Sequence, residues 1–114
     1  MTTVTLPWPP SVNTYWRKWN GRMVLSDEGR NYRLCAAAEM IGVDHFDGRC
    51  SVEIAVFRPD DKIRDMDNML KAPIDALVAC GIIQGDSTRH LRRIAIDDMG
   101  IDRERPRLEV TITQ

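Results

Sequence analysis

The sequence lacks several features that mark well-known classes of protein. No apolar run reaches the roughly 18 residues of a membrane-spanning helix, and no charged and then apolar leader opens the chain. Its three cysteines, Cys35, Cys50 and Cys80, stand at wide spacings with no C-x-x-C pair, which excludes a disulfide framework and a zinc ribbon. We therefore expect a soluble cytoplasmic protein with no membrane partner, whose cysteines are small, buried apolar residues.

The sequence also has no strong excess of charge. Its 16 Lys and Arg residues are balanced by 17 Asp and Glu residues, so the formal net charge of -1 gives no global sign of a nucleic-acid partner. Thirteen of the cations are arginines, whose planar guanidinium suits bidentate contacts with phosphate. The cations cluster at 17 to 33, 58 to 71, 89 to 93 and 103 to 107. Any anion-binding site is therefore a local patch.

The apolar residues that are present predict one compact domain. With 114 residues and 43% hydrophobic content, the chain can bury one core, so residues 1–114 are expected to form a single domain. Alternating apolar residues predict strands at the start of the chain and at three later places, 50 to 58, about 89 to 97 and 107 to 113. The pair Asn20-Gly21 is a strong signal for a small hairpin.

Two helices are predicted between these strands. Ser26 is a good N-cap, and Gly42 would end the helix that follows it. The expected buried stripe of this helix is Tyr32, Cys35, Ala36 and Met40. A second helix is expected from near Asp67 to Gly81, with Pro73 causing either a kink or a tight first turn. The order of elements predicts an α+β fold, in which a small mixed β-sheet packs with two α-helices.

The stretch RDMDNMLK, residues 64 to 71, is the main candidate for chemistry. Residues two apart share a side of an extended chain but not of an α-helix, so Asp65 and Asp67 reach one ion only if Asp65 precedes the helix. Asp67 would then lie at or near the N-cap, with Lys71 one turn along the same face. A purely structural account stays open, in which Asp67 is only a cap, Lys71 pairs with Asp67 and Asp75, and Asp65 belongs to a charged loop.

Two known motifs do not fit this stretch. An EF-hand loop starting at Asp65 would place Met69 and Leu70 where a ligand and a glycine are required. A nucleotide-sugar D-x-D motif would need a Rossmann-like domain, and the chain lacks the glycine fingerprint for one.

A third acid favours a metal site. Asp86 follows the second helix in a glycine-bounded turn, and three carboxylates with no histidine nearby in sequence form a hard oxygen site suited to Mg²⁺ or Mn²⁺. Cations surround these acids in the sequence, as a phosphate-bearing substrate would require. They are Arg64, Lys71, Arg89, Arg92 and Arg93.

A second group of cations and aromatic residues lies around the expected hairpin. The cations are candidates to follow DNA phosphates, although each could equally be solvated surface. They are Arg17, Lys18, Arg22, Arg30 and Arg33. Tyr15, Trp16 and Trp19 could stack on unpaired bases, but an aromatic near a hairpin more often belongs to the core or to a dimer interface.

Several stretches of the chain together resemble the RusA-type Holliday junction resolvases, small endodeoxyribonucleases of bacteria, their phages and prophages. These stretches are LPWPPSVNTYWR, SDEGRNYR, RDMDNMLKAPIDAL, GIIQGDS and RLEVTIT, which together cover most of the chain. The N-terminal string and the R-D-x-D-N-x-x-K core are much more specific than a lone D-x-D. The resemblance therefore weighs strongly against the purely structural account.

The resemblance implies which residues are catalytic. The paired aspartates of the family match Asp65 and Asp67, its third acid matches Asp86, and its essential lysine matches Lys71. The three aspartates would bind Mg²⁺, with Mn²⁺ as a possible substitute. In one departure from the family, Gly85 stands where a further acid often precedes the third aspartate.

Other residues are expected to bind DNA. Arg64 and Asn68 match positions of the motif and are expected to contact the substrate or support the site. Four further cations are candidates for DNA contact, namely Arg17, Lys18, Arg89 and Arg92.

The resemblance also implies a homodimer on a four-way DNA junction, making paired symmetric nicks in recombination and repair. A two-fold substrate is most simply bound by a two-fold dimer, and a small chain spans a junction only by doubling. The alternative is a catalytically inactive or regulatory dimer that binds junction DNA. The presence of all three acids and the lysine argues against this alternative.

Overall fold

The computed structural model describes all residues, 1–114. In chain order the elements are β1 (Thr2–Pro7), α1 (Val12–Tyr15), β2 (Trp16–Trp19), β3 (Arg22–Leu25), α2 (Asp27–Glu39), β4 (Cys50–Arg58), the 3₁₀ helix η1 (Met66–Met69), α3 (Lys71–Ala79), β5 (Leu91–Ile101) and β6 (Arg107–Thr113). None of the helices is long and apolar enough to span a membrane.

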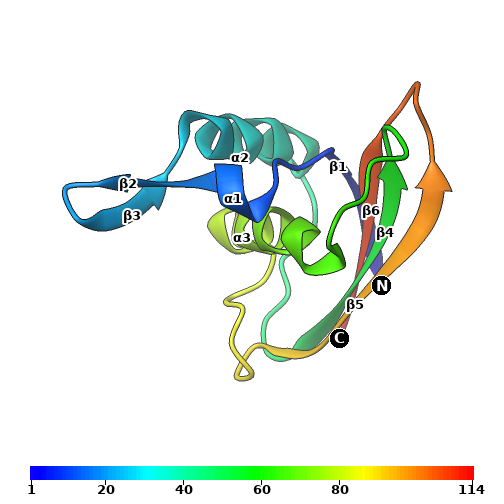
Figure 1. The fold of residues 1–114 in the computed structure, drawn as a ribbon. Helices are drawn as coiled ribbons and strands as arrows, with labels where there is room; N and C mark the ends of the chain where they lie inside the picture. The colour runs from blue at the N-terminus through cyan, green and yellow to red at the C-terminus, as the bar shows by residue number, and fades with distance from the viewer.

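Four strands form a mixed sheet in the order β1-β6-β4-β5. β6 pairs antiparallel with both β1 and β4, whereas β4 and β5 pair in parallel. The parallel pair requires a crossover connection, which is the segment that carries η1 and α3. Helices α2 and α3 lie together on one side of the sheet (Figure 1). The predicted α+β fold, with two main helices on a small mixed sheet, is confirmed.

The core lies between this sheet and the helices. Alternate residues of the two central strands are almost completely buried, as the period-two pattern predicts: Val52, Ile54, Val56, Leu108, Val110 and Ile112. Residues between them, such as Glu53 and Thr111, point to the other face of the sheet, which is polar. One apolar face of the sheet therefore packs against the helices, and the other face is left to solvent.

The first long helix begins and ends where the sequence predicts. The Ser26 hydroxyl accepts a hydrogen bond from the Gly29 amide at 3.0 Å, and Gly42 beyond the helix has a φ of 79°. Three of the four residues expected in the buried stripe are buried, namely Tyr32, Ala36 and Met40. Cys35 is exposed, so its predicted burial is wrong, because it lies three residues after Tyr32 at the margin of the apolar stripe.

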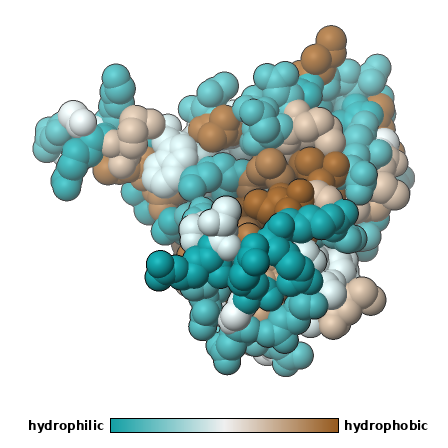
Figure 2. Space-filling view, turned by 90° about the horizontal axis from the view of Figure 1, so that it is seen from below, coloured by the Kyte–Doolittle hydropathy of each residue, from teal (hydrophilic) through white to brown (hydrophobic).

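The hairpin of β2 and β3 projects from the body of the protein (Figures 1 and 2). Asn20 and Gly21 join the strands with φ values of 49° and 74°, the two positive values that a type I′ turn needs. The short helix α1, which the sequence did not predict, leads into this hairpin and ends at the fully buried Tyr15. The predicted hairpin is confirmed.

The 3₁₀ helix η1, which winds more tightly than an α-helix, leads the chain into α3. Asp65 is the N-cap of η1, and its carbonyl accepts a hydrogen bond from the Asn68 amide at 3.1 Å. Asp67 is therefore a residue of the first turn of η1 and not the cap of a long helix. Because α3 begins at Lys71, Pro73 lies in its first turn, where a missing N–H is tolerated. The prediction of a tight first turn is confirmed.

Candidate active site

Lys71 and Asp86 come together at the start of α3. Lys71 is the first residue of that helix, and the loop after the helix returns Asp86 to within 3.9 Å of the Lys71 Nζ atom. The Lys71 ammonium also lies 5.7 Å from the centre of the Trp16 ring, within range of a cation–π contact. The alternative pairing of Lys71 with Asp67 does not occur, and Asp75 forms its ion pair with Arg33 instead.

Asp65 and Asp67 lie just before α3, and both are exposed. The Asp65 backbone is extended, with φ −74° and ψ 134°, so this residue stands outside the helix as predicted. Neither carboxylate forms an ion pair or a side-chain hydrogen bond. As the side chains stand, the structure contains no group of three or more His, Cys, Asp or Glu residues that could hold a metal ion.

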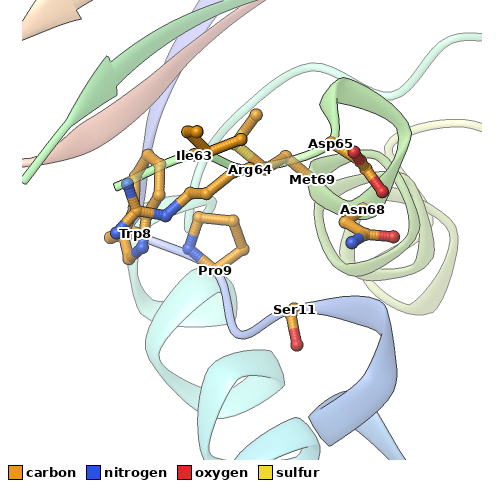
Figure 3. A pocket seen from close by; sticks show the side chains of 8 residues that line it. All are labelled: Trp8, Pro9, Ser11, Ile63, Arg64, Asp65, Asn68 and Met69. Carbon is orange, nitrogen blue, oxygen red and sulfur yellow. The ribbon is translucent and has the colours of Figure 1, made fainter. Parts of the chain in front are cut away.

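A pocket of about 300 Å³ opens beside Asp65. Figure 3 shows its lining, with the Arg64 side chain extending toward Trp8 and the Asp65 and Asn68 side chains together at the other end. The Arg64 guanidinium lies 5.3 Å from the centre of the Trp8 ring and 2.8 Å from the Asp60 carboxylate. Asp65 and Asn68 thus share one cavity with an arginine that is already paired.

A partly buried polar network supports α3 behind the candidate site. Arg33 donates two hydrogen bonds to the Asp75 carboxylate, at 2.6 and 3.0 Å, and the Tyr15 hydroxyl donates a third. Burial and the bond to Asp75 raise the pKa of Tyr15 to about 12. Burial also acts to raise the pKa of Asp75, but the bonds from Arg33 and Tyr15 outweigh it and hold that pKa below its usual value.

This network corrects two sequence-based interpretations. Arg33 is engaged by a half-buried acid and is not a solvated cation that follows phosphates. Tyr15 has no exposed surface, so it cannot stack on a DNA base. Trp19 near the hairpin turn is exposed and remains a candidate for such stacking.

The other predicted DNA-binding residues are spread over three parts of the surface. Arg17 and Lys18 are exposed on β2 in the projecting hairpin. Arg89 is exposed in the loop that also carries Asp86. Arg92, at the start of β5, donates hydrogen bonds to the carbonyls of Arg49 and Thr113 and not to a residue of the candidate site.

Comparison with known proteins identifies the family to which the chain belongs. The model of the family "Endodeoxyribonuclease RusA" matches residues 7–113. The chain belongs to the RusA family. A crossover junction endodeoxyribonuclease RusA of Enterobacteria phage 82 is 37% identical over 114 residues, 97% of this chain and 92% of the relative. The protein of the same name from Escherichia coli strain K12 is 36% identical over 115 residues, 98% of this chain and 93% of the relative.

A shorter match supports the same family. The crossover junction endodeoxyribonuclease RusA of Enterobacteria phage HK97 is 36% identical over 84 residues, which are 71% of this chain and 70% of the relative. Two of these three relatives align with nearly the whole chain, so membership of the RusA family applies to the complete α+β domain described above.

The structure leaves little room for a side chain at Gly85, the position at which the sequence departs from the RusA pattern. A Cβ atom at Gly85 would lie 2.6 Å from Cδ2 of the His90 ring, so any side chain there requires this ring to move. His90 is held by its own backbone, whose amide bonds to the Ser87 carbonyl at 2.9 Å and whose carbonyl accepts from Cys50 at 3.0 Å. In this RusA-family chain, the imidazole ring therefore occupies the space that a side chain at position 85 would need.

Sequence reasoning missed the aromatic neighbours of the candidate site. Trp16 was considered for stacking on bases, yet it lies against Lys71, and Trp8 lies against Arg64. No periodic pattern marks these contacts, because each joins residues more than one element apart. The only signal was the occurrence of both tryptophans in the N-terminal string that resembles the RusA family.

Proposed function

We propose that this chain is a Mg²⁺-dependent endodeoxyribonuclease that resolves four-way DNA junctions by paired symmetric nicks. The observation that carries the proposal is the contact of Lys71 with Asp86 at the start of α3, the helix that directly follows the exposed Asp65 and Asp67. The relatives named above are crossover junction endodeoxyribonucleases, and they align with this chain almost from end to end. The reaction would take place in the cytoplasm, during recombination and repair of DNA.

The chemistry of the acids fits a divalent metal ion. Asp65, Asp67 and Asp86 would hold Mg²⁺, for which Mn²⁺ could substitute, because all three offer only hard carboxylate oxygens. When bound, such an ion activates water for attack on phosphorus and stabilises the leaving 3′ oxygen. The exposure of Asp65 and Asp67, and their lack of protein partners, leaves these carboxylates free to coordinate.

Lys71 would stabilise negative charge on the scissile phosphate. Its ammonium group is held between the Asp86 carboxylate and the Trp16 ring, which restricts where the charge lies. Removal of one such preorganised positive group commonly lowers the rate by about 10²–10³-fold. The bonds of Arg33 and Tyr15 to Asp75, one turn along α3, would keep the helix start in place.

DNA would be bound by the surface that surrounds this site. Arg64 and Asn68 line the adjoining pocket and would contact the strand near the cut, and Arg89 would contact the phosphates beside Asp86. Arg17 and Lys18 on the projecting hairpin would reach a neighbouring arm of the junction. Arg92, which lies on β5, would act only at the margin of the bound DNA.

A synthetic four-way junction tests the proposal directly. We expect paired nicks in opposite strands with Mg²⁺, none without it, and no cutting of a linear duplex of the same sequence. Asp65→Asn, Asp67→Asn and Asp86→Asn should each abolish nicking and spare junction binding, because each removes negative charge that faces DNA. Asp44→Asn, at an exposed position outside the site, is the matched control and should cut normally.

Three results would count against the proposal. Binding without cutting by the unaltered chain would indicate the regulatory alternative. Equal cutting of duplex and junction would indicate a nonspecific nuclease. Full activity in all three aspartate variants would show that the site lies elsewhere.

A further inference from the structure

Trp16 belongs both to the projecting hairpin and to the candidate active site. It is the first residue of β2 and pairs with Leu25 at the end of β3, so these two residues form the root of the hairpin (Figure 1). The centre of its ring also lies 5.7 Å from the Lys71 ammonium group. One side chain therefore joins the element that would bind a DNA arm to the group that would act on the scissile phosphate.

The root of the hairpin is fixed to the body of the protein. The Tyr15 carbonyl accepts hydrogen bonds from the amide and from the hydroxyl of Ser26, both at 3.0 Å. The same hydroxyl lies 2.6 Å from the Thr14 carbonyl. Trp16 and Leu25 are partly buried and pack against the hydrophobic core. The exposed part of the hairpin therefore extends from an anchored base.

Tyr15 restricts the orientation of the Trp16 ring. The two rings meet edge to face, with their centres 5.3 Å apart and their planes at 86°. Tyr15 is fully buried, and its hydroxyl donates a hydrogen bond to the Asp75 carboxylate on α3. Asp75 lies four residues after Lys71, on the same face of that helix. Tyr15 thus contacts the Trp16 ring on one side and the helix that carries Lys71 on the other.

The Lys71 side chain has few other restraints. It is 39% exposed, and its ion pair with Asp86, at 3.9 Å, is close to the longest distance that such a pair allows. A lysine ammonium on its flexible four-carbon stem samples many positions unless another group restrains it. The face of an indole ring attracts a cation, most strongly where water is partly excluded. The half-buried Trp16 ring is therefore a restraint on the position of the Lys71 charge.

We propose that Trp16 is a positioning residue, which holds the Lys71 ammonium at a fixed place relative to the base of the hairpin. A junction arm bound by Arg17 and Lys18 would then present one defined phosphate to Lys71. The substrate is that of the proposed function, on which this inference rests, whereas the contact of Lys71 with Trp16 needs neither DNA nor metal. Trp16 then aligns the strand that is cut and does not stack on a base, because its ring is already engaged by Lys71 and Tyr15.

The contact can be measured without cleavage. The chain has three lysines, Lys18, Lys62 and Lys71, so ¹³C-labelled lysine gives an NMR spectrum simple enough to assign. We expect the ε-methylene signal of Lys71, assigned through Lys71→Met, to be shifted upfield by the ring current of the indole. In Trp16→Leu this signal should move back toward that of the exposed Lys62, which serves as the internal control.

Cleavage measures the effect of the contact on the reaction. The rate would be measured with the protein in excess over a four-way junction, and the cuts mapped to single nucleotides. We expect Trp16→Leu to cut about tenfold more slowly and to spread its cuts over neighbouring phosphates, with junction affinity nearly unchanged. Trp16→Phe keeps an aromatic face and should recover most of the rate and the single cut position.

Two further variants separate positioning from loss of structure. In the Lys71→Met background, Trp16→Leu should have no additional effect on the rate, because the group that it positions is gone. Phe46→Leu, at a partly buried aromatic residue outside the site, is the matched control and should cut at the normal rate.

The outcomes distinguish this inference from the proposed function. A Lys71 signal that is not shifted, or that Trp16→Leu leaves in place, would overturn the inference whether or not the chain cuts DNA. A loss of affinity with an unchanged rate would indicate stacking on a base instead. An equal loss of rate in the Lys71→Met background, or in Phe46→Leu, would indicate a merely structural role. A chain with the shifted Lys71 signal that cuts no junction would contradict only the proposed nuclease activity.

Discussion

The Nζ atom of Lys71 and the Oδ2 atom of Asp86 lie 3.9 Å apart, although the whole of α3 and a loop separate the two residues in sequence. This contact joins the start of the helix to the third acid of the candidate site. The Trp16 ring lies against the same ammonium group. A positive group held in this way is suited to stabilise a phosphate group during cleavage.

Removal of the Lys71 charge should therefore affect the reaction more than binding. We expect Lys71→Met to lower the rate of junction cleavage by about 10²–10³-fold under single-turnover conditions. Junction affinity should change by less than tenfold, since only one charge is lost. Lys62→Met removes an exposed lysine of the preceding loop and is the matched control. Equal loss of rate in both variants would mean that Lys71 acts only through general charge.

The network behind α3 should contribute to stability. Tyr15→Phe removes one of the hydrogen bonds to the partly buried Asp75 carboxylate, which should lower the free energy of unfolding by roughly 1–2 kcal/mol. Urea denaturation would measure this difference. Tyr32→Phe removes a hydroxyl that bonds to a neutral carbonyl, that of Pro7, and should have a smaller effect. A larger loss in Tyr32→Phe would contradict the importance assigned to the charged network.

Asp75 should also make stability depend on pH. Its pKa in the folded protein lies below the usual value of 3.8, so the unfolded chain binds the proton more readily. The stabilisation is therefore complete above about pH 5 and declines as the pH falls below 3.8 toward the folded-state pKa. The difference in unfolding free energy between the unaltered chain and Asp75→Asn should narrow between pH 5 and pH 2.5. A difference that stays constant with pH would rule out this source of stability.

The close approach of α1 to α2 depends on a glycine. A Cβ atom at Gly29 would lie 2.6 Å from the Tyr15 carbonyl oxygen and 2.9 Å from Cδ2 of Leu25. Gly29→Ala should therefore lower the free energy of unfolding by about 1–3 kcal/mol, although alanine is the better helix former. The midpoint of thermal unfolding would report this loss. Asn31→Ala, at an exposed position of the same helix, should be neutral or slightly stabilising.

The projecting hairpin should supply part of the affinity for DNA. Replacing both Arg17 and Lys18 by alanine removes two exposed charges from β2. Junction affinity should fall, and the slope of log affinity against log salt should become less steep by about 2, since each phosphate contact contributes about 1. The double variant R103A/R105A removes two exposed charges from the turn before β6 and serves as the control. Equal changes in both double variants would indicate an unspecific charge effect.

Much of the fold could be predicted because its signals are local. The Ser26 cap, the Asn20-Gly21 turn and the alternation of Val52, Ile54 and Val56 each depend on neighbouring residues alone. The same is true of Asp65, which must precede the helix if both aspartates are to point one way. These expectations match the structure because local geometry and the final packing agree at these positions.

Other features could not be predicted because they depend on which elements meet. The exposure of Cys35 depends on the width of the surface that covers α2, and the burial of Tyr15 depends on how α1 packs. The engagement of Arg33 by Asp75 joins two helices, and no pattern within either helix indicates it. Sequence spacing alone left Arg33 as either a phosphate-binding cation or a solvated one.

The sequence by itself determined the residue types of the candidate site and the alternation of apolar residues along the strands. Only the tertiary structure decided that Lys71 meets Asp86 and that β5 forms the border of the sheet. The physical reason is that residue type and periodicity are properties of short segments. Contacts between distant segments arise when the chain buries its apolar faces, and that burial depends on all of the elements together.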